Sequence, residues 1–190
     1  MILPIRAFGD AVLRKHCHDI DKDYPELQTL IDNLFETMHS ANGIGLAAPQ
    51  VGLDIRLFVV DISPLAEDED YEDIAEELKD FKKVFINAKI LEESGEEWKF
   101  NEGCLSIPDV REDVKRKETI VIQYYDENFV KHTDTFSDMR ARVIQHEYDH
   151  IEGILFTDHL SSLKKKLVKG KLMKISHGDV SVNYKMRFPK

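Results

Sequence analysis

Apolar residues recur at three- and four-residue intervals in two long stretches of the chain, which is the spacing of an amphipathic helix. Within residues 24–42 the series comprises Leu27, Leu30, Ile31, Leu34, Phe35 and Met38. Within and just after residues 137–153 it comprises Met139, Val143, Ile151, Ile154 and Leu155. Pro25 suits the first turn of the first helix, Ser137 is a candidate N-cap of the second, and Gly153 can end it. We therefore predict two helices, each packed on the core through one face.

Shorter apolar runs between these helices predict strands. They cover residues 57–62, 84–86, 89–91, 119–125 and 129–135. Gly95 indicates a turn, and Asp-Glu-Asn at residues 126–128 indicates a hairpin between the last two strands. Toward the C-terminus, residues 163–169 predict a basic amphipathic helix and residues 180–186 a last strand. Strands therefore dominate the middle of the chain.

The length of 190 residues is enough for one domain with a substantial core. We expect an α+β fold made of a single domain, residues 1–190. Antiparallel strands would pack around a central helix at 137–153, with an N-terminal helix on one side and a C-terminal helix plus strand at the end.

Charge is distributed unevenly along the chain. The formal net charge is −10, and acidic residues crowd into residues 64–83, which predict a surface insertion with a short helix. This charge argues against DNA as a partner, because phosphate contacts need an excess of Lys and Arg. The chain shows neither a run long enough to cross a bilayer nor the apolar region of a signal peptide. We expect a cytoplasmic protein without a membrane contact.

The sequence His-Glu-Tyr-Asp-His at residues 146–150 carries the candidate chemistry. Residues four apart lie on one face of a helix, so His146 and His150 can bind a single metal ion. Glu147 can reach water on that ion without being a ligand itself. A solvated helix whose histidines have no function is the alternative. The apolar neighbours place the histidines on or beside a buried face, which favours the metal site.

A catalytic metal site needs at least one more protein ligand and one open position. Metzincin proteases extend the motif with a third histidine, but Phe156 occupies that position here. Thermolysin-like proteases use a glutamate from a later helix, and the short lysine-rich tail offers none of that kind. Upstream, Cys104 lies between Gly103 and Ile107-Pro108 in a predicted bend. Since Cys17 is the only other cysteine, a disulfide framework is excluded, and Cys104 is the best remaining ligand.

Three motifs now occur in order along the chain. Residues 43–50 are Gly-Ile-Gly-Leu-Ala-Ala-Pro-Gln, residues 102–106 are Glu-Gly-Cys-Leu-Ser, and residues 146–150 complete the series. By these motifs the chain resembles peptide deformylases, whose signatures are Gly-x-Gly-x-Ala-Ala-Pro-Gln, Glu-Gly-Cys-x-Ser and His-Glu-x-x-His. The resemblance covers nearly the whole chain and implies removal of the formyl group from the N-terminal methionine of new polypeptides, with release of formate.

The resemblance also implies roles for individual residues. The divalent metal would be held by Cys104, His146 and His150. Glu147 would take a proton from the attacking water and later deliver one to the leaving amine. The developing oxyanion would be stabilised by the metal, by the Gln50 side chain and by the Leu105 backbone N–H.

The methionine side chain of the substrate would occupy an apolar pocket along the metal-binding helix. By position this pocket would include Ile44, Phe100, Met139, Arg142 and Val143. Gly45 would offer a backbone group to the substrate, and Arg142 is expected to line the rim with its guanidinium in water. Arg116, bridging Glu102 and Asp149, would fix the Cys104 loop against the helix. An ordinary surface ion pair is the alternative for these three residues.

The ligand set does not determine the metal. Cysteine with two histidines suits Zn²⁺, and the affinity order favours Zn²⁺ over Fe²⁺. On resemblance we expect Fe²⁺ in the cell, and Zn²⁺ or another divalent ion in preparations. The expected partners are N-formyl-methionyl nascent peptides, with the lysine-rich residues 163–169 a candidate ribosome contact or simply a solvated face. A zincin-like metallopeptidase and a non-catalytic metal-binding module remain alternative functions.

Overall fold

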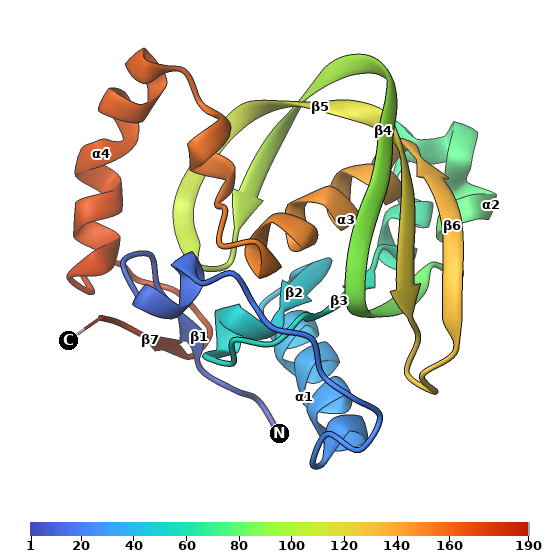
Figure 1. The fold of residues 1–190 in the computed structure, drawn as a ribbon. Helices are drawn as coiled ribbons and strands as arrows, with labels where there is room; N and C mark the ends of the chain where they lie inside the picture. The colour runs from blue at the N-terminus through green and yellow to red at the C-terminus, as the bar shows by residue number, and fades with distance from the viewer. Residues whose placement is uncertain (190) are drawn as a thin grey trace.

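The computed structural model describes residues 1–189. The strands are β1 (Ile5–Arg6), β2 (Gly45–Ala47), β3 (Leu57–Asp61), β4 (Lys82–Cys104), β5 (Ile107–Tyr125), β6 (Lys131–Ser137) and β7 (Met186–Arg187). The helices are α1 (Leu27–Ser40), α2 (Ala75–Leu78), α3 (Asp138–Ile151) and α4 (Ser162–Ser176). Strands β2 to β6 form an antiparallel sheet in the order β2-β3-β4-β5-β6, and β1 pairs with β7 in parallel (Figure 1). The α+β class expected from the sequence is confirmed.

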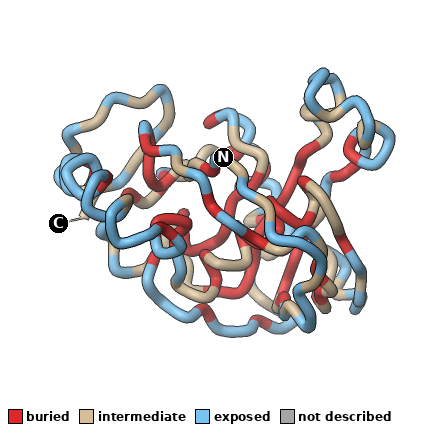
Figure 2. The backbone as a smooth tube through the Cα atoms, turned by 90° about the horizontal axis from the view of Figure 1, so that it is seen from above, coloured by how far each residue is buried: buried red, intermediate tan, exposed pale blue. Residues whose placement is uncertain are grey.

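Strand β3 is completely buried because helices cover both faces of the sheet at this strand. Successive side chains of a strand point to opposite faces. Phe58 and Val60 accordingly join the core cluster that includes side chains of α3, whereas Leu57 and Val59 join the cluster that includes those of α1. The buried backbone lies in the middle of the molecule, around α3 (Figures 1 and 2). This packing holds α3 rigidly at the centre, where the metal-binding motif lies.

Strands β4 and β5 form a long hairpin that curves over α3 (Figure 1). The turn predicted at Gly95 is wrong, because β4 continues through this residue. A shift of register between Ser94 and Glu97 marks a bulge there, so one extra residue bends the strand without reversing it. Residues 107–118, for which no strand was expected, belong to β5. The hairpin ends in a two-residue turn, Leu105 and Ser106, beside α3.

The remaining elements differ from expectation mainly at their ends. Helix α1 begins at Leu27, after Pro25, because Glu26 at the N-cap adopts a left-handed conformation with φ of 53°. Gly153, with φ of 74°, follows the end of α3 as expected. The last strand is only β7, so most of residues 180–186 are irregular.

The acidic residues 64–83 form a series of short helical turns that ends with α2 and then lead into β4 at Lys82, at one end of the molecule (Figure 1). Leu78 and Phe81 are buried and anchor this segment on the core, while most of its carboxylates are exposed. Among residues 1–189, none of the helices has both the length and the apolar character required to traverse a lipid bilayer.

Candidate metal centre and active site

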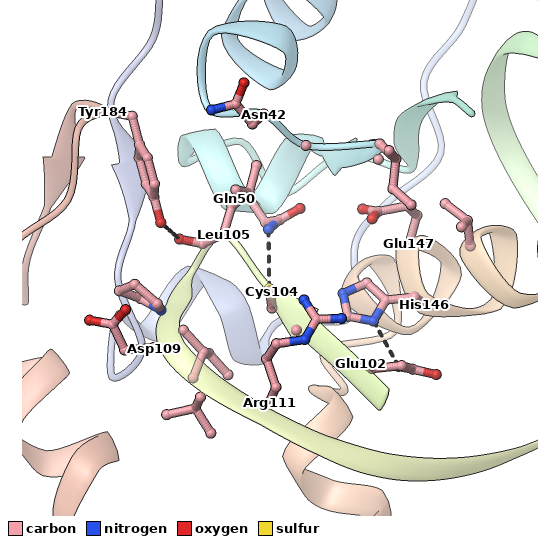
Figure 3. A pocket seen from close by; sticks show the side chains of 18 of the residues that line it. Asn42, Gln50, Glu102, Cys104, Leu105, Asp109, Arg111, His146, Glu147 and Tyr184 are labelled. Carbon is pink, nitrogen blue, oxygen red and sulfur yellow. Dashed lines mark hydrogen bonds and ion pairs between the residues drawn. The ribbon is translucent and has the colours of Figure 1, made fainter. Parts of the chain in front are cut away.

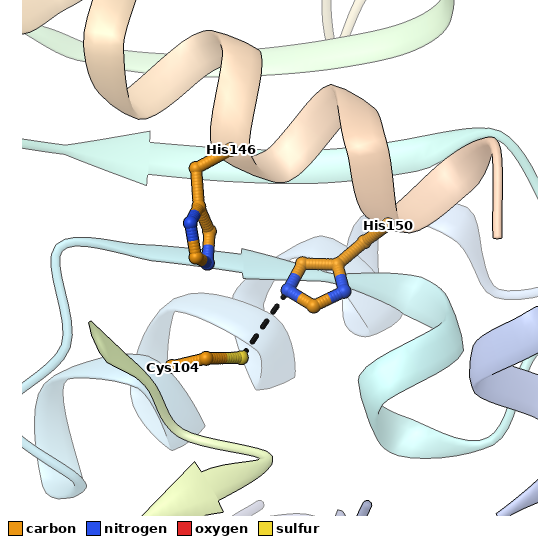
Figure 4. A group of neighbouring side chains, drawn as sticks. All are labelled: Cys104, His146 and His150. Carbon is orange, nitrogen blue, oxygen red and sulfur yellow. Dashed lines mark hydrogen bonds between the residues drawn. The ribbon is translucent and has the colours of Figure 1, made fainter. Parts of the chain in front are cut away.

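Helix α3 presents His146 and His150 on one face, one turn apart. Their ring centroids are 5.2 Å apart. Nδ1 of His146 lies 2.9 Å from Oε2 of Glu102, which leaves Nε2 of His146 free to face the centre. Nε2 of His150 lies 3.3 Å from Sγ of Cys104 (Figure 4). The two imidazoles therefore converge on the thiol.

Cys104 comes from the end of β4, at the turn of the long hairpin. The possible ligand atoms of Cys104, His146 and His150 all lie within 4.8 Å of one another. Ligands about 2.0–2.3 Å from one tetrahedral ion are about 3.3–3.8 Å from each other. The observed spacing of the sulfur and the two nitrogens therefore fits a single divalent ion.

The surroundings of Cys104 favour the thiolate, which is the form that binds metal. Burial alone would raise the pKa of the Cys104 thiol, but the charge of His150 and hydrogen bonds with both histidines lower this pKa to about 5. At neutral pH the sulfur is consequently ionised. The donor set of one thiolate and two imidazoles is typical of a catalytic site that keeps one position open.

Glu147 lies beside the centre and is buried. Burial raises the pKa of the Glu147 carboxyl to about 7, although the charges of His146 and His150 act in the opposite direction. Its Oε2 is buried without a hydrogen-bond partner among residues 1–189. A buried carboxylate with an unpaired oxygen and a pKa near neutrality is well suited to accept and return a proton.

Glu102 is the centre of a buried network of charges behind the histidines. Arg116 donates to both oxygens of Glu102, at 2.7 and 3.0 Å, and also to Asp149 at 2.8 Å. Burial alone would raise the pKa of the Glu102 carboxyl, but His146 and Arg116 outweigh burial and hold this pKa well below its ordinary value. The network joins β4, β5 and α3, because its members come from all three elements.

The structure overturns the expectation that the guanidinium of Arg142 lies in water. The Arg142 side chain is 2% exposed. Its guanidinium donates to Glu102 at 2.9 Å and to the Trp98 carbonyl at 2.7 Å, and it stacks 4.2 Å from the centroid of the Trp98 ring. The long β4–β5 hairpin covers this face of α3 and supplies carboxylate and carbonyl partners, so the charge is satisfied inside the protein.

Replacing Glu102 with glutamine is expected to lower the free energy of unfolding by about 3–5 kcal/mol, because Arg116 and Arg142 lose a buried counter-charge. The folded pKa of Glu102 is below the ordinary value of 4.5. Its contribution is therefore present above about pH 4.5 and is lost as the pH falls through the folded pKa. Urea denaturation at several pH values measures both effects.

Glu112→Gln on β5 is the matched control for this measurement. Glu112 pairs with Lys164 on the surface, where the loss of one ion pair costs about 0–1 kcal/mol. Equal losses in the two variants at pH 7 would show that the Glu102 network is no more important for stability than a surface pair.

The turn at residues 105–106 is fixed by contacts from distant parts of the chain. Gln50 is buried, and its Nε2 donates to Cys104 Sγ at 3.4 Å and to Ser106 Oγ at 3.2 Å. The Gln50 Oε1 accepts a hydrogen bond from the Ala47 N–H at 2.9 Å, which orients the amide. The hydroxyl of Tyr184 donates to the Leu105 carbonyl at 2.8 Å (Figure 3). The Gln50 amide and the Leu105 peptide group are thus held next to the metal ligands.

A cavity of about 810 Å³ opens in front of this centre. Every residue proposed from the sequence for the methionine pocket lines it, namely Ile44, Phe100, Met139, Arg142 and Val143. Gly45, Gln50, Cys104, Leu105, His146 and Glu147 line the same cavity. A small polar cluster and an apolar pocket therefore share one space.

Two residues of the site were not identified from the sequence. Ser106 belonged to a motif that was noticed, but its contact with Gln50 was not. Tyr184 was assigned only to a predicted strand, and its contact with Leu105 was missed because the two residues are 79 positions apart along the chain. The carbonyl partners of Arg142 were also missed, since they depend on strand pairing that brings distant residues together.

Comparisons with known proteins agree with this geometry. Residues 2–166 match the sequence model of the family described as polypeptide deformylase. A peptide deformylase of Christiangramia forsetii is 63% identical over 190 residues, covering 100% of this chain and 97% of that protein. A crystal structure of a peptide deformylase from Legionella pneumophila superposes with a TM-score of 0.79 at 35% identity, covering 94% and 98% of the two chains. A peptide deformylase from Ehrlichia chaffeensis gives a TM-score of 0.80 at 32% identity, covering 95% and 99%. The chain belongs to the peptide deformylase family.

Proposed function

We propose that the chain removes the formyl group from N-formyl-methionyl peptides at the Cys104, His146 and His150 centre, with Glu147 as the base. Deformylase activity follows from membership of the family; the roles of individual residues are our proposal. The observation that carries it is the convergence of three ligand atoms within 4.8 Å beside a buried carboxylate.

Cys104, His146 and His150 would hold the divalent ion, which when bound acidifies water and polarises a carbonyl. Glu102 accepts a hydrogen bond from Nδ1 of His146, which selects the tautomer that leaves Nε2 as a ligand. Arg116 ties Glu102 to Asp149 on α3 and so keeps the end of β4 against the helix.

Glu147 then serves twice in the hydrolysis. It first takes a proton from the water whose oxygen attacks the formyl carbon. As the carbon–nitrogen bond breaks, it delivers that proton to the departing amine, so the products are formate and a free N-terminus. Its pKa of about 7 suits both steps, because the carboxyl group can lose and regain a proton near neutral pH.

Gln50 and Leu105 would stabilise the negative charge that develops on the formyl oxygen. The Nε2 of Gln50 already points into the centre toward Cys104 Sγ (Figure 3). Tyr184 donates to the Leu105 carbonyl, in the peptide unit that follows the Leu105 N–H, and so fixes the turn that carries this N–H. Donors that are fixed before the reaction pay no reorganisation cost during it.

The side chain of the substrate methionine would lie in the apolar part of the cavity. Ile44 comes from the loop before β2, Phe100 from β4, and Met139 and Val143 from the first turns of α3. The aliphatic part of Arg142 contributes to the same wall, while its charge is neutralised by Glu102 behind it. An unbranched apolar side chain fits such a pocket.

Replacing Gly45 with alanine is expected to reduce kcat/KM for deformylation by about 10²-fold. A Cβ at this position would lie 2.4 Å from Oε1 of Glu147. Cβ atoms in real proteins do not come so close to another heavy atom. The carboxylate must move away from its position, and small displacements of a reacting group are costly. Steady-state kinetics with formyl-Met-Ala, together with a melting temperature, measures the effect.

Gly170→Ala in α4 is the matched control for Gly45→Ala. Apart from its chain neighbours and the backbone of its own helix, no atom lies within 4 Å of the added Cβ at this position. Alanine should therefore stabilise the helix by about 1 kcal/mol and leave deformylation unchanged. If Gly45→Ala is equally active, the close approach of Gly45 to Glu147 has no importance for catalysis.

We further propose Fe²⁺ as the metal in the cell and Zn²⁺ as an occupant after aerobic handling. The iron assignment is supported by the family resemblance, and the zinc assignment by the thiolate and by the affinity order. Metal analysis of protein prepared without oxygen tests it.

Because the substrate is a newly made polypeptide, the cytoplasm is the proposed location. We also propose that residues 64–83 are a surface insertion within a single domain.

Helix α4 is the proposed contact with the ribosome. Lys165, Lys166 and Lys169 are exposed on it beside the exposed apolar residues Leu163 and Leu167. Reversing the charges of the three lysines to glutamate should lower co-sedimentation with ribosomes several-fold at physiological salt, because phosphate contacts are electrostatic. Deformylation of a short peptide should stay unchanged. Undiminished co-sedimentation would exclude α4 as the contact.

The test of the function itself is formate release from formyl-Met-Ala, measured with and without a chelator. We expect turnover that the chelator abolishes and that added Fe²⁺ restores. Cleavage of internal peptide bonds would instead indicate a metallopeptidase. Metal binding with no turnover of either kind would indicate a non-catalytic module.

A further inference from the structure

The far end of the cavity is formed by the chain's C-terminal segment. Residues 181–184 line the cavity, with Tyr184 across it from His146 and Glu147 (Figure 3). They lie beyond the residues 2–166 that match the family model. This wall is therefore contributed by a part of the chain that the family-wide match does not include.

Two sets of contacts hold this segment in place. Strand β7 follows it directly and pairs with β1, with Met186 opposite Ile5. Tyr184 donates its hydroxyl proton to the Leu105 carbonyl at 2.8 Å. The Phe8 N–H, just after β1, donates to the Ser106 carbonyl at 2.9 Å. The segment and the strand that anchors it thus both bond to the same two-residue turn.

The size of the cavity leaves room beyond the methionine. A volume of about 810 Å³ is at the upper end of the range in which a pocket encloses a drug-sized ligand. Side chains at the C-terminal end of the cavity include the polar and exposed Ser181 and Asn183. Polar, exposed positions suit a peptide backbone or varied side chains better than one apolar side chain.

We propose that residues 181–184 are a wall of the substrate groove that binds the peptide residues following the formyl-methionine, and that Tyr184 is a positioning residue for the Leu105 turn. The proposal rests on the deformylase function above and extends it to downstream substrate residues. Ser181 and Asn183 would bind the backbone of these residues. Tyr184 would act through the Leu105 carbonyl, by fixing the turn that carries the Leu105 N–H next to the metal ligand Cys104.

The wall is tested with the double variant Ser181→Ala, Asn183→Ala and two substrates, formyl-Met-Ala and formyl-Met-Ala-Ala-Ala. We expect the ratio of KM for the longer peptide to KM for the shorter one to rise by about 3- to 10-fold, because the longer peptide loses one or two hydrogen bonds in the variant. Both side chains are exposed, so the variant should fold. An unchanged KM ratio would overturn the proposal that residues 181–184 bind the downstream residues of the substrate.

Tyr184→Phe tests the positioning role, because it removes only the hydroxyl. We expect kcat to fall by about 3- to 10-fold for both peptides with little change in the KM ratio. Tyr125→Phe, at the end of β5 and outside the cavity lining, is the matched control and should have unaltered kcat. An equal kcat in Tyr184→Phe and the control would overturn the positioning role.

A chain without deformylase activity and a chain without the proposed wall give different results in these experiments. If the unaltered chain does not release formate from formyl-Met-Ala, the proposed function itself is wrong. If it does release formate, and the double variant leaves the ratio of the two KM values unchanged, only the proposed role of residues 181–184 is wrong. Melting temperatures of all variants identify any loss of activity that comes from unfolding.

Discussion

Glu147→Gln is expected to reduce kcat/KM for deformylation by about 10²- to 10⁴-fold while the metal stays bound. The amide has nearly the size of the carboxylate but cannot accept the water proton, and general base catalysis contributes about this factor. The three ligand residues, Cys104, His146 and His150, are unchanged, so metal content should be unaffected. Steady-state kinetics and metal analysis on the same preparation measure both quantities.

The pH dependence of the unaltered enzyme provides a second view of Glu147. Burial raises the pKa of its carboxyl to about 7, and a bound cation would move this pKa downward. Because the base must be ionised to accept a proton, kcat/KM should fall as the pH drops through the pKa of this carboxyl in the metal-bound enzyme, which lies below about 7. Glu127→Gln, on the exposed β5–β6 connection, should leave activity and profile unchanged. A Glu147→Gln enzyme within tenfold of normal activity would mean that another group is the base.

Cys104→Ala is expected to weaken metal binding by at least about 100-fold and to abolish deformylation with it. Loss of an outer partner of a ligand alone costs about 10–100-fold in metal affinity, so loss of a ligand should cost no less. The thiolate is also the only anionic ligand in the set, and its pKa of about 5 keeps it charged at neutral pH. Competition with a chromogenic chelator measures the affinity.

Cys17→Ala is the natural control, because Cys17 is the chain's other cysteine and is buried in the core. Burial raises the pKa of the Cys17 thiol to about 11, so it stays neutral. Its replacement should lower the melting temperature modestly and leave metal affinity unchanged. Full metal affinity in Cys104→Ala would remove the sulfur from the coordination sphere.

The sequence predicted α3 and its histidines well because the signal there is local. The apolar spacing around residues 137–153 specifies a helix, and spacing of four along a helix places His146 beside His150 whatever surrounds it. Gly45 was expected, by resemblance, to offer a backbone group to the substrate, and the structure adds its close approach to Glu147.

The environment of Arg142 could not be predicted in the same way. On a helical wheel an arginine beside apolar residues points to the rim, because water is the usual partner of a guanidinium. Its actual partners are Glu102 and the Trp98 carbonyl, 40 and 44 positions away along the chain. Both partners lie on β4, and only the path of the curved β4–β5 hairpin over α3 brings them to Arg142 (Figure 1).

The wall at residues 181–184 illustrates the same limit. The alternation of residues 180–186 suggested a strand, but only Met186 and the next residue pair, and they pair with β1 at the other end of the chain. Tyr184 reaches the Leu105 carbonyl because β1 and β7 pair with each other beside the turn at residues 105–106. Such contacts follow from the topology of the whole domain, so they are visible only once it is known.

The most direct measurement of the central claim is anomalous X-ray scattering from crystals of protein prepared without oxygen. We predict a single anomalous peak, at its metal's absorption edge, within about 2.0–2.3 Å of Cys104 Sγ and one nitrogen each of His146 and His150. A peak coordinated by the histidines without the sulfur, or none between these three side chains, would contradict the account.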